Sequence, residues 1–163
     1  MMLAVIIILN LHRGAILAQQ PKPSPEPPRF PEAPASARLW KSLTTGKEYR
    51  VWTSNSQLYA EWINITPESR QHGAYIRTEC QRAGTRWIGI SHSLLPCERE
   101  GNNRNDYNWC PWVTKIEIDR VEADRMTGRA EGLKRHDCNG CKILETVWKD
   151  FEWVPKEPSA VGK

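Results

Sequence analysis

Apolar and polar residues alternate along much of the chain after residue 38, which is the pattern of strands that bury one face. The alternation is clearest between residues 112 and 132, on either side of a polar turn at 122–124. One face of this stretch carries small or apolar residues: Trp112, Thr114, Ile116, Ile118, Met126, Gly128, Ala130 and Gly132. A period of two with one apolar face indicates a half-buried strand. The pattern therefore predicts an antiparallel hairpin here.

A second hairpin is predicted around a turn at residues 55–56, because both faces of the two runs agree on one register. One face is then continuously apolar and consists of Tyr49, Val51, Leu58, Ala60 and Trp62. The opposite face pairs Arg50 with Glu61 and Trp52 with Tyr59. Cross-strand charge and aromatic pairs of this kind stabilise a sheet by a few tenths to about 1 kcal/mol each.

The remaining strands are less regular. A third hairpin is predicted over residues 74–93, turning at Ala83 and Gly84, and a closing strand over 146–154, in which Lys149 breaks an otherwise apolar face. One helical turn is predicted at residues 67–70, with Thr66 as its N-cap.

We expect an all-β fold, a small antiparallel meander of about seven to eight strands, stabilised by disulfides. It forms a barrel or a sandwich, and a barrel is favoured because closure removes exposed strand edges.

The first 18 residues predict export. An apolar run at residues 3–9 is followed by the small residue Ala18, the order of a cleavable leader, although no Lys or Arg precedes the run. A retained membrane anchor is disfavoured because spanning a bilayer takes about 20 apolar residues. We therefore expect a secreted or periplasmic protein with no membrane span after cleavage.

Composition divides the rest of the chain. Residues 19–37 contain seven prolines and predict a disordered linker, residues 38–155 a single β domain, and residues 156–163 a disordered tail. The 23 basic and 19 acidic residues are interleaved, whereas nucleic-acid binding requires basic residues gathered on one face. We therefore expect no nucleic-acid partner.

Five cysteines in an exported chain indicate disulfides, with one thiol left over. The favoured pair is Cys97 with Cys110, since the two residues flank a polar loop that packing alone would not hold. Cys138 and Cys141 either bond to each other or send one partner to Cys80.

The Cys138 and Cys141 pair also allows two functional interpretations. A redox pair needs a thiolate stabilised by a helix N-terminus or by nearby positive charge; Arg135, His136 and Lys142 supply charge, but no helix is predicted there. A metal site would need His136 and either Cys110 or Cys80 to complete its ligands. We expect neither a metal nor a cofactor, and a haem attachment motif would require histidine at Lys142.

Catalytic residues are not predicted. Ser91 and His92 are neighbours, and on a strand neighbours point to opposite faces, so they cannot simply act as nucleophile and base. Carboxylates such as Asp119 and Asp124 have no spacing that indicates a glycosidase.

Two surfaces are candidates for binding. Trp52 and Tyr59, beside Arg50 and Glu61, could form an exposed platform for a sugar ring or a protein partner, or could simply steady the hairpin. The small residues of 128–132 could leave space inside a barrel. The leading hypothesis is an exported, non-enzymatic β-barrel domain that binds a small molecule, a glycan or a protein. The alternative is a thiol-disulfide or metal-binding protein centred on Cys138 and Cys141.

The first prediction concerns the leader. The mature chain should begin near Gln19, because the apolar run ends at Ala18. N-terminal sequencing or the intact mass of the native protein would measure this directly. Recovery of an uncleaved chain from the cytoplasm would contradict the prediction.

Overall fold

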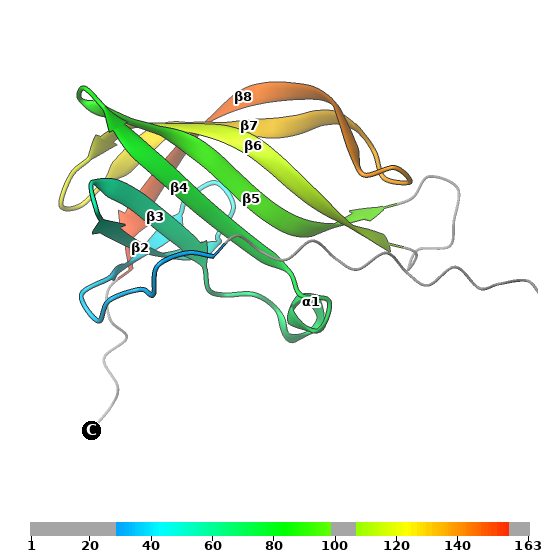
Figure 1. The fold of residues 1–163 in the computed structure, drawn as a ribbon, viewed down its shortest axis with the longest axis horizontal. Coiled ribbons are helices and arrows are strands. Elements are labelled where there is room, and N and C mark those ends of the chain that lie inside the picture. Colours follow the sequence, from blue (N-terminus) through cyan, green and yellow to red (C-terminus); the bar gives the residue numbers. More distant parts are fainter. Residues whose placement is uncertain (1–28, 99–106, 157–163) are drawn as a thin grey trace, which may run out of the picture.

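The computed structural model describes residues 29–98 and 107–156 (Figure 1). The predicted leader, most of the predicted linker and nearly all of the predicted tail lie outside these ranges. The described chain forms eight strands and one short helix. In chain order they are β1 Arg38–Ser42, β2 Glu48–Ser54, β3 Gln57–Trp62, α1 Pro67–Gln71, β4 Tyr75–Ala83, β5 Arg86–Glu98, β6 Tyr107–Val121, β7 Met126–Asp137 and β8 Lys142–Pro155.

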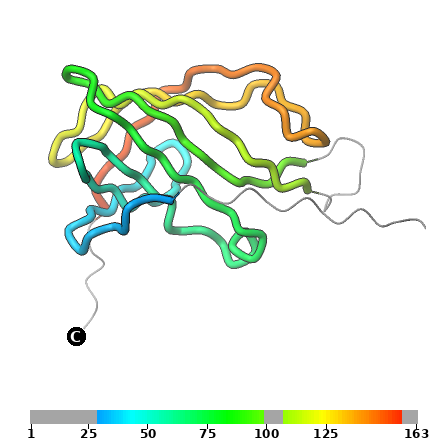
Figure 2. The backbone as a smooth tube through the Cα atoms, in the orientation of Figure 1, coloured from blue at the N-terminus to red at the C-terminus, as the bar shows by residue number. Residues whose placement is uncertain are grey.

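The strands form an antiparallel meander that closes on itself. Each strand pairs with the next, and β1 pairs with β8 to complete a ring of eight (Figure 2). The predicted fold class is confirmed, including the number of strands and the disulfides.

The ring is complete at one end and split at the other. Ladder pairing between β6 and β7 runs from Val121 and Met126 only as far as Ile116 and Ala130. Beyond that pair, residues 107–115 and 131–137 form no ladder with one another. The β7–β8 hairpin therefore diverges from β6 toward its turn, as Figures 1 and 2 show. We call this opening the β6–β7 split.

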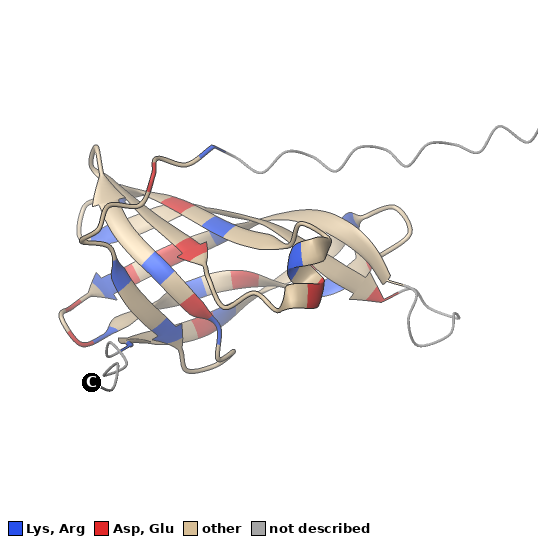
Figure 3. Cartoon of the chain, turned by 90° about the horizontal axis from the view of Figure 1, so that it is seen from below, with Lys and Arg blue, Asp and Glu red and all other residues tan. Residues whose placement is uncertain are grey.

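The hydrophobic core occupies mainly the complete end of the barrel. Its buried residues come from seven of the strands: Trp40, Tyr49, Val51, Leu58, Ala60, Cys80, Ile116, Ile118, Met126 and Trp153. Burying one large apolar side chain contributes about 1.5–3 kcal/mol, so this cluster is the main source of stability. Much of the outer surface carries ion pairs, and basic and acidic residues are interspersed over the visible strands (Figure 3).

Most predicted elements are confirmed. The 49–62 hairpin has the expected register, and its turn residues Asn55 and Ser56 take positive φ values of 50° and 61°. Thr66 caps the short helix by accepting a hydrogen bond from the backbone N–H of Ser69. The third hairpin turns one residue later than predicted, and β8 begins earlier than the predicted closing strand. Strand β1 was not predicted, because five residues are too few to show a clear period.

Gly128 corrects one expectation about the interior. A Cβ at this position would lie 2.1 Å from the carbonyl oxygen of Glu117 on β6, so neighbouring backbone already fills the place. Gly89 on β5 has the same role, with the Glu79 carbonyl oxygen 1.9 Å from its Cβ position. Glycine in a strand permits this close approach of backbone. Of the three small residues at 128–132, Ala130 and Gly132 border a cavity inside the barrel, and Gly128 does not.

The second prediction compares two glycines on the same face of β7. Gly128→Ala should lower the free energy of unfolding by about 1–3 kcal/mol, because the new methyl group meets rigid backbone. Gly132→Ala should change it by less than about 1 kcal/mol, because its methyl group would meet only the flexible end of Lys149. Thermal or denaturant melts of the two variants measure the difference. Equal destabilisation would show that Gly128 does not have this role.

Candidate functional site

A cavity of about 310 Å³ lies inside the barrel at the split end. Its walls come from β2 and β4–β8, together with Ser42, Thr44 and Thr45 at the end of β1 and just after it. A barrel of eight strands is just wide enough to be filled by side chains or to hold one small ligand. Here the complete end is filled, and the split end leaves the space.

Aromatic side chains form the apolar part of the cavity wall. Tyr49 stacks on Trp153 with ring centroids 4.3 Å apart and an interplanar angle of 7°. Phe151 packs against Trp153 at 5.1 Å, and Trp112 faces them from β6. Burial raises the pKa of the Tyr49 phenol, so this group is a neutral hydrogen-bond donor throughout the physiological range.

Hydroxyl groups interrupt this apolar lining. Thr78 donates a hydrogen bond to Ser91 over 3.0 Å. The hydroxyls of Ser93 and Tyr49 make no hydrogen bond with any residue in the described ranges, although both residues are buried. Both residues line the cavity, so their hydroxyls are not sealed inside the packed core. These two therefore remain available to a ligand or to water inside the cavity.

Polar side chains bridge the β6–β7 split beside the cavity. The backbone N–H of Lys115 donates to the Glu131 carboxylate over 3.0 Å, and the Thr146 hydroxyl lies 3.4 Å from its other oxygen. Nearer the β7–β8 turn, the Asn108 side chain donates to the carbonyl oxygen of Cys138 over 2.7 Å. These contacts take the place of the missing ladder.

Two disulfides fasten the same end of the barrel. They join Cys97 to Cys138 and Cys110 to Cys141, so the four predicted cysteines are all bonded. The favoured Cys97–Cys110 pairing is wrong. Cys97 lies opposite Asn108 in the β5–β6 ladder, two positions away from Cys110. Both cysteines instead bond to the β7–β8 turn.

The position of these bonds explains their structural value. They close sequence separations of 41 and 31 residues, for which the chain-entropy estimate is about 4 kcal/mol each. They also tie the turn of the β7–β8 hairpin to β5 and β6, across the split that no ladder closes. Disulfides form and persist in oxidising surroundings, so the protein belongs in an oxidising compartment outside the cytoplasm.

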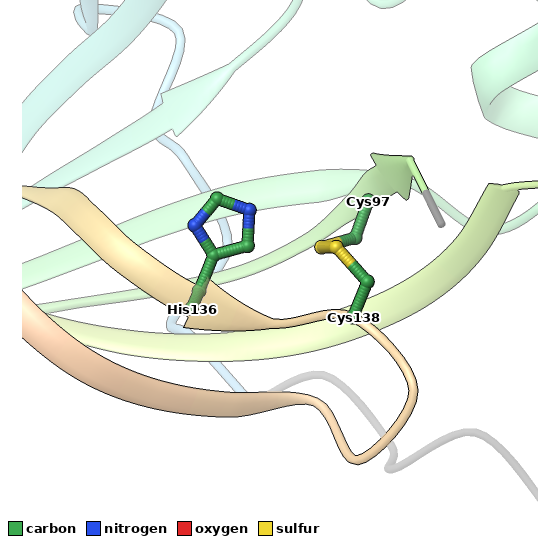
Figure 4. A group of neighbouring side chains, drawn as sticks. All are labelled: Cys97, His136 and Cys138. Carbon is green, nitrogen blue, oxygen red and sulfur yellow. A yellow bond between two sulfur atoms is a disulfide. The ribbon is translucent and has the colours of Figure 1, made fainter. Parts of the chain in front are cut away.

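The Cys138 and Cys141 pair does not behave as one redox or metal unit. The two residues bond to different strands, and neither bonds to the other or to Cys80. Cys97, His136 and Cys138 do have ligand atoms within 4.8 Å of one another (Figure 4). Both sulfurs are engaged in the disulfide, however, and a metal requires thiolates. In this arrangement only the histidine nitrogen remains as a ligand.

The expected exposed platform on β2 and β3 is wrong. Trp52 and Tyr59 are each only 6% exposed. Phe30, from the segment before β1, packs against Tyr59 with ring centroids 5.4 Å apart. The segment folds back over the outside of the sheet, so this face is covered by the chain itself. A pattern of alternation could not reveal this, because it describes one hairpin and not what packs on it.

The other two members of that predicted site, Arg50 and Glu61, lie opposite each other in the β2–β3 ladder, as predicted. Glu61 forms an ion pair with Arg77 of β4 at 2.9 Å, whereas Arg50 is exposed. Trp62, expected in the core, is only partly buried, and its indole N–H donates to Asn64 over 2.6 Å. The structure therefore does not assemble the four predicted residues into one open surface.

No protein family, curated protein or solved structure matches this chain, so the site is interpreted from its own geometry. Within residues 29–98 and 107–156, no helix has the length and apolar character needed to cross a membrane.

The third prediction concerns Cys80, the unpaired cysteine. Its side chain is in the core, and burial, followed by the charge of Glu79, raises the pKa of its thiol to about 12. The reactive thiolate should therefore be scarce at every pH at which the fold persists. Mass spectrometry after iodoacetamide treatment should show almost no labelling of native protein and one label per chain in guanidinium. Rapid labelling of the native protein would contradict this assignment.

Proposed function

We propose that this domain binds a small, largely apolar molecule inside its barrel, in a compartment outside the cytoplasm, without chemically changing it. The observation that carries the proposal is the cavity of about 310 Å³ at the split end of the barrel. Sites for small ligands begin at about 300 Å³ and combine an apolar lining with a few placed polar groups.

The lining fits this kind of ligand. The rings of Tyr49, Phe151 and Trp153 offer flat apolar surface on one side of the cavity. The free hydroxyls of Ser93 and Tyr49 offer hydrogen bonds that would orient a polar group on the ligand. An apolar body with few polar atoms would satisfy both parts of the lining.

The arrangement of side chains supports binding over nucleophilic catalysis. Ser91 lies in the cavity wall, where its hydroxyl is bonded to Thr78. His92 belongs to the opposite face of β5, so no histidine from this strand reaches that hydroxyl. A nucleophile requires a base within hydrogen-bond reach.

Export is part of the proposal. The two disulfides support an oxidising compartment, and the apolar residues at the start of the sequence support delivery there. A binding protein of this size could carry or collect its ligand on the outer side of a membrane.

The fourth prediction fills the cavity. Ala130 lines it and packs against the core, so Ala130→Phe should place a ring in the ligand space and weaken binding at least tenfold. The probe is N-phenyl-1-naphthylamine, an uncharged dye whose fluorescence rises in apolar surroundings. Titration of the wild type and the variant gives the two affinities.

The matched control is Val113→Phe, which adds a ring at a position on β6 that is 53% exposed. It should bind the dye as the wild type does, and melting curves should show that both variants are folded. Failure of the wild type to bind the dye, or equal binding by the folded Ala130 variant, would overturn the proposed site.

A further inference from the structure

We propose that Lys149 selects ligands that carry an anionic head group, so that the ligand class is an apolar body with one terminal anion such as a carboxylate. This inference rests on the proposed function of the cavity. It adds the chemical class of the ligand and the residue that determines it.

The position of Lys149 in β8 is the first observation. Val147, Phe151 and Trp153 share its face of the strand, and alternation would place an apolar residue between them. Lys149 instead lines the cavity together with Phe151 and Trp153. This face of β8 therefore contributes two aromatic residues and one lysine to the cavity wall.

The second observation is that β7 makes room for the lysine side chain. A Cβ at Gly132 would lie 3.1 Å from both Cδ and Cε of Lys149 and 3.5 Å from its Nζ. The side chain therefore crosses directly over Gly132, where any larger residue would push it aside. The stem covers apolar surface while the ammonium stays at the rim, as lysine commonly does.

The third observation is that the Lys149 ammonium has no partner among the residues that the structure describes. Within the described ranges it forms neither an ion pair nor a hydrogen bond, whereas Lys134 and Lys156 each pair with a glutamate at 2.6 Å and 2.7 Å. Asp150 also lines the cavity and lies across the ladder from Arg129, and it forms no ion pair with Lys149. The Glu131 carboxylate is engaged by the backbone N–H of Lys115.

These observations together define the bound arrangement. The apolar body would lie against Phe151 and Trp153, and its anionic head would meet the ammonium at the rim. A charge-assisted hydrogen bond there is stronger than one between neutral groups. Because the rim is open to water, neither charge has to be fully desolvated, which keeps the cost of pairing low.

The test compares two ligands of the same length that differ in head group. Octanoate and 1-octanol each compete with N-phenyl-1-naphthylamine for the wild type, for Lys149→Gln and for Lys41→Gln. Lys41 is the control, because it is exposed on β1 and does not line the cavity. Melting curves confirm that each variant is folded.

Lys149→Gln should weaken octanoate about tenfold, the loss of one charge-assisted contact, and leave 1-octanol unchanged. Lys41→Gln should change neither ligand, and added salt should weaken only octanoate. The inference is overturned if Lys149→Gln affects both ligands equally or affects neither. If the wild type binds the dye but octanoate does not displace it, the inference fails and the proposed function stands. If the dye does not bind at all, both fail.

Discussion

The cavity depends on two disulfides that hold the β7–β8 turn to the ends of β5 and β6. Between Ile116 and the turn, β6 and β7 share no ladder, so hydrogen bonding alone does not keep the hairpin against the rest of the barrel. An unpaired hairpin of this length is marginally stable in water. The covalent links compensate for the missing ladder and so preserve a space that a complete ladder would tend to close.

The two ends of the barrel therefore have different roles. At the complete end, short strands and close backbone contacts at Gly89 and Gly128 draw the sheet tightly around a packed core. At the split end, Ala130 and Gly132 leave space, Glu131 bridges the edges, and Lys149 lies over Gly132. Stability comes mainly from the first end, and the capacity to bind is proposed for the second.

Much of the fold could be predicted because it follows from local rules. The 49–62 hairpin has one register in which one face is continuously apolar and the other pairs charged and aromatic residues. Thr66 caps the N-terminus of the short helix, as its residue type predicts. The candidate site was harder to predict from the sequence. In the sequence, Lys149 is only a break in an apolar strand face. Its position at the cavity depends on Gly132, which lies on another strand. Trp52 looked exposed because nothing in its own hairpin indicates that Phe30 and its neighbours cover that face.

The sequence by itself determined the class of fold, the turn of the 49–62 hairpin and the oxidation of four cysteines, because these depend on alternation, turn chemistry and composition. The tertiary structure alone decided which cysteines pair, which face of β2 and β3 is covered, and where the cavity lies. The physical reason is that each of these depends on contacts between strands far apart in the chain. Strand pairing sets those contacts, and a period of two within one strand does not show which distant strand lies beside it.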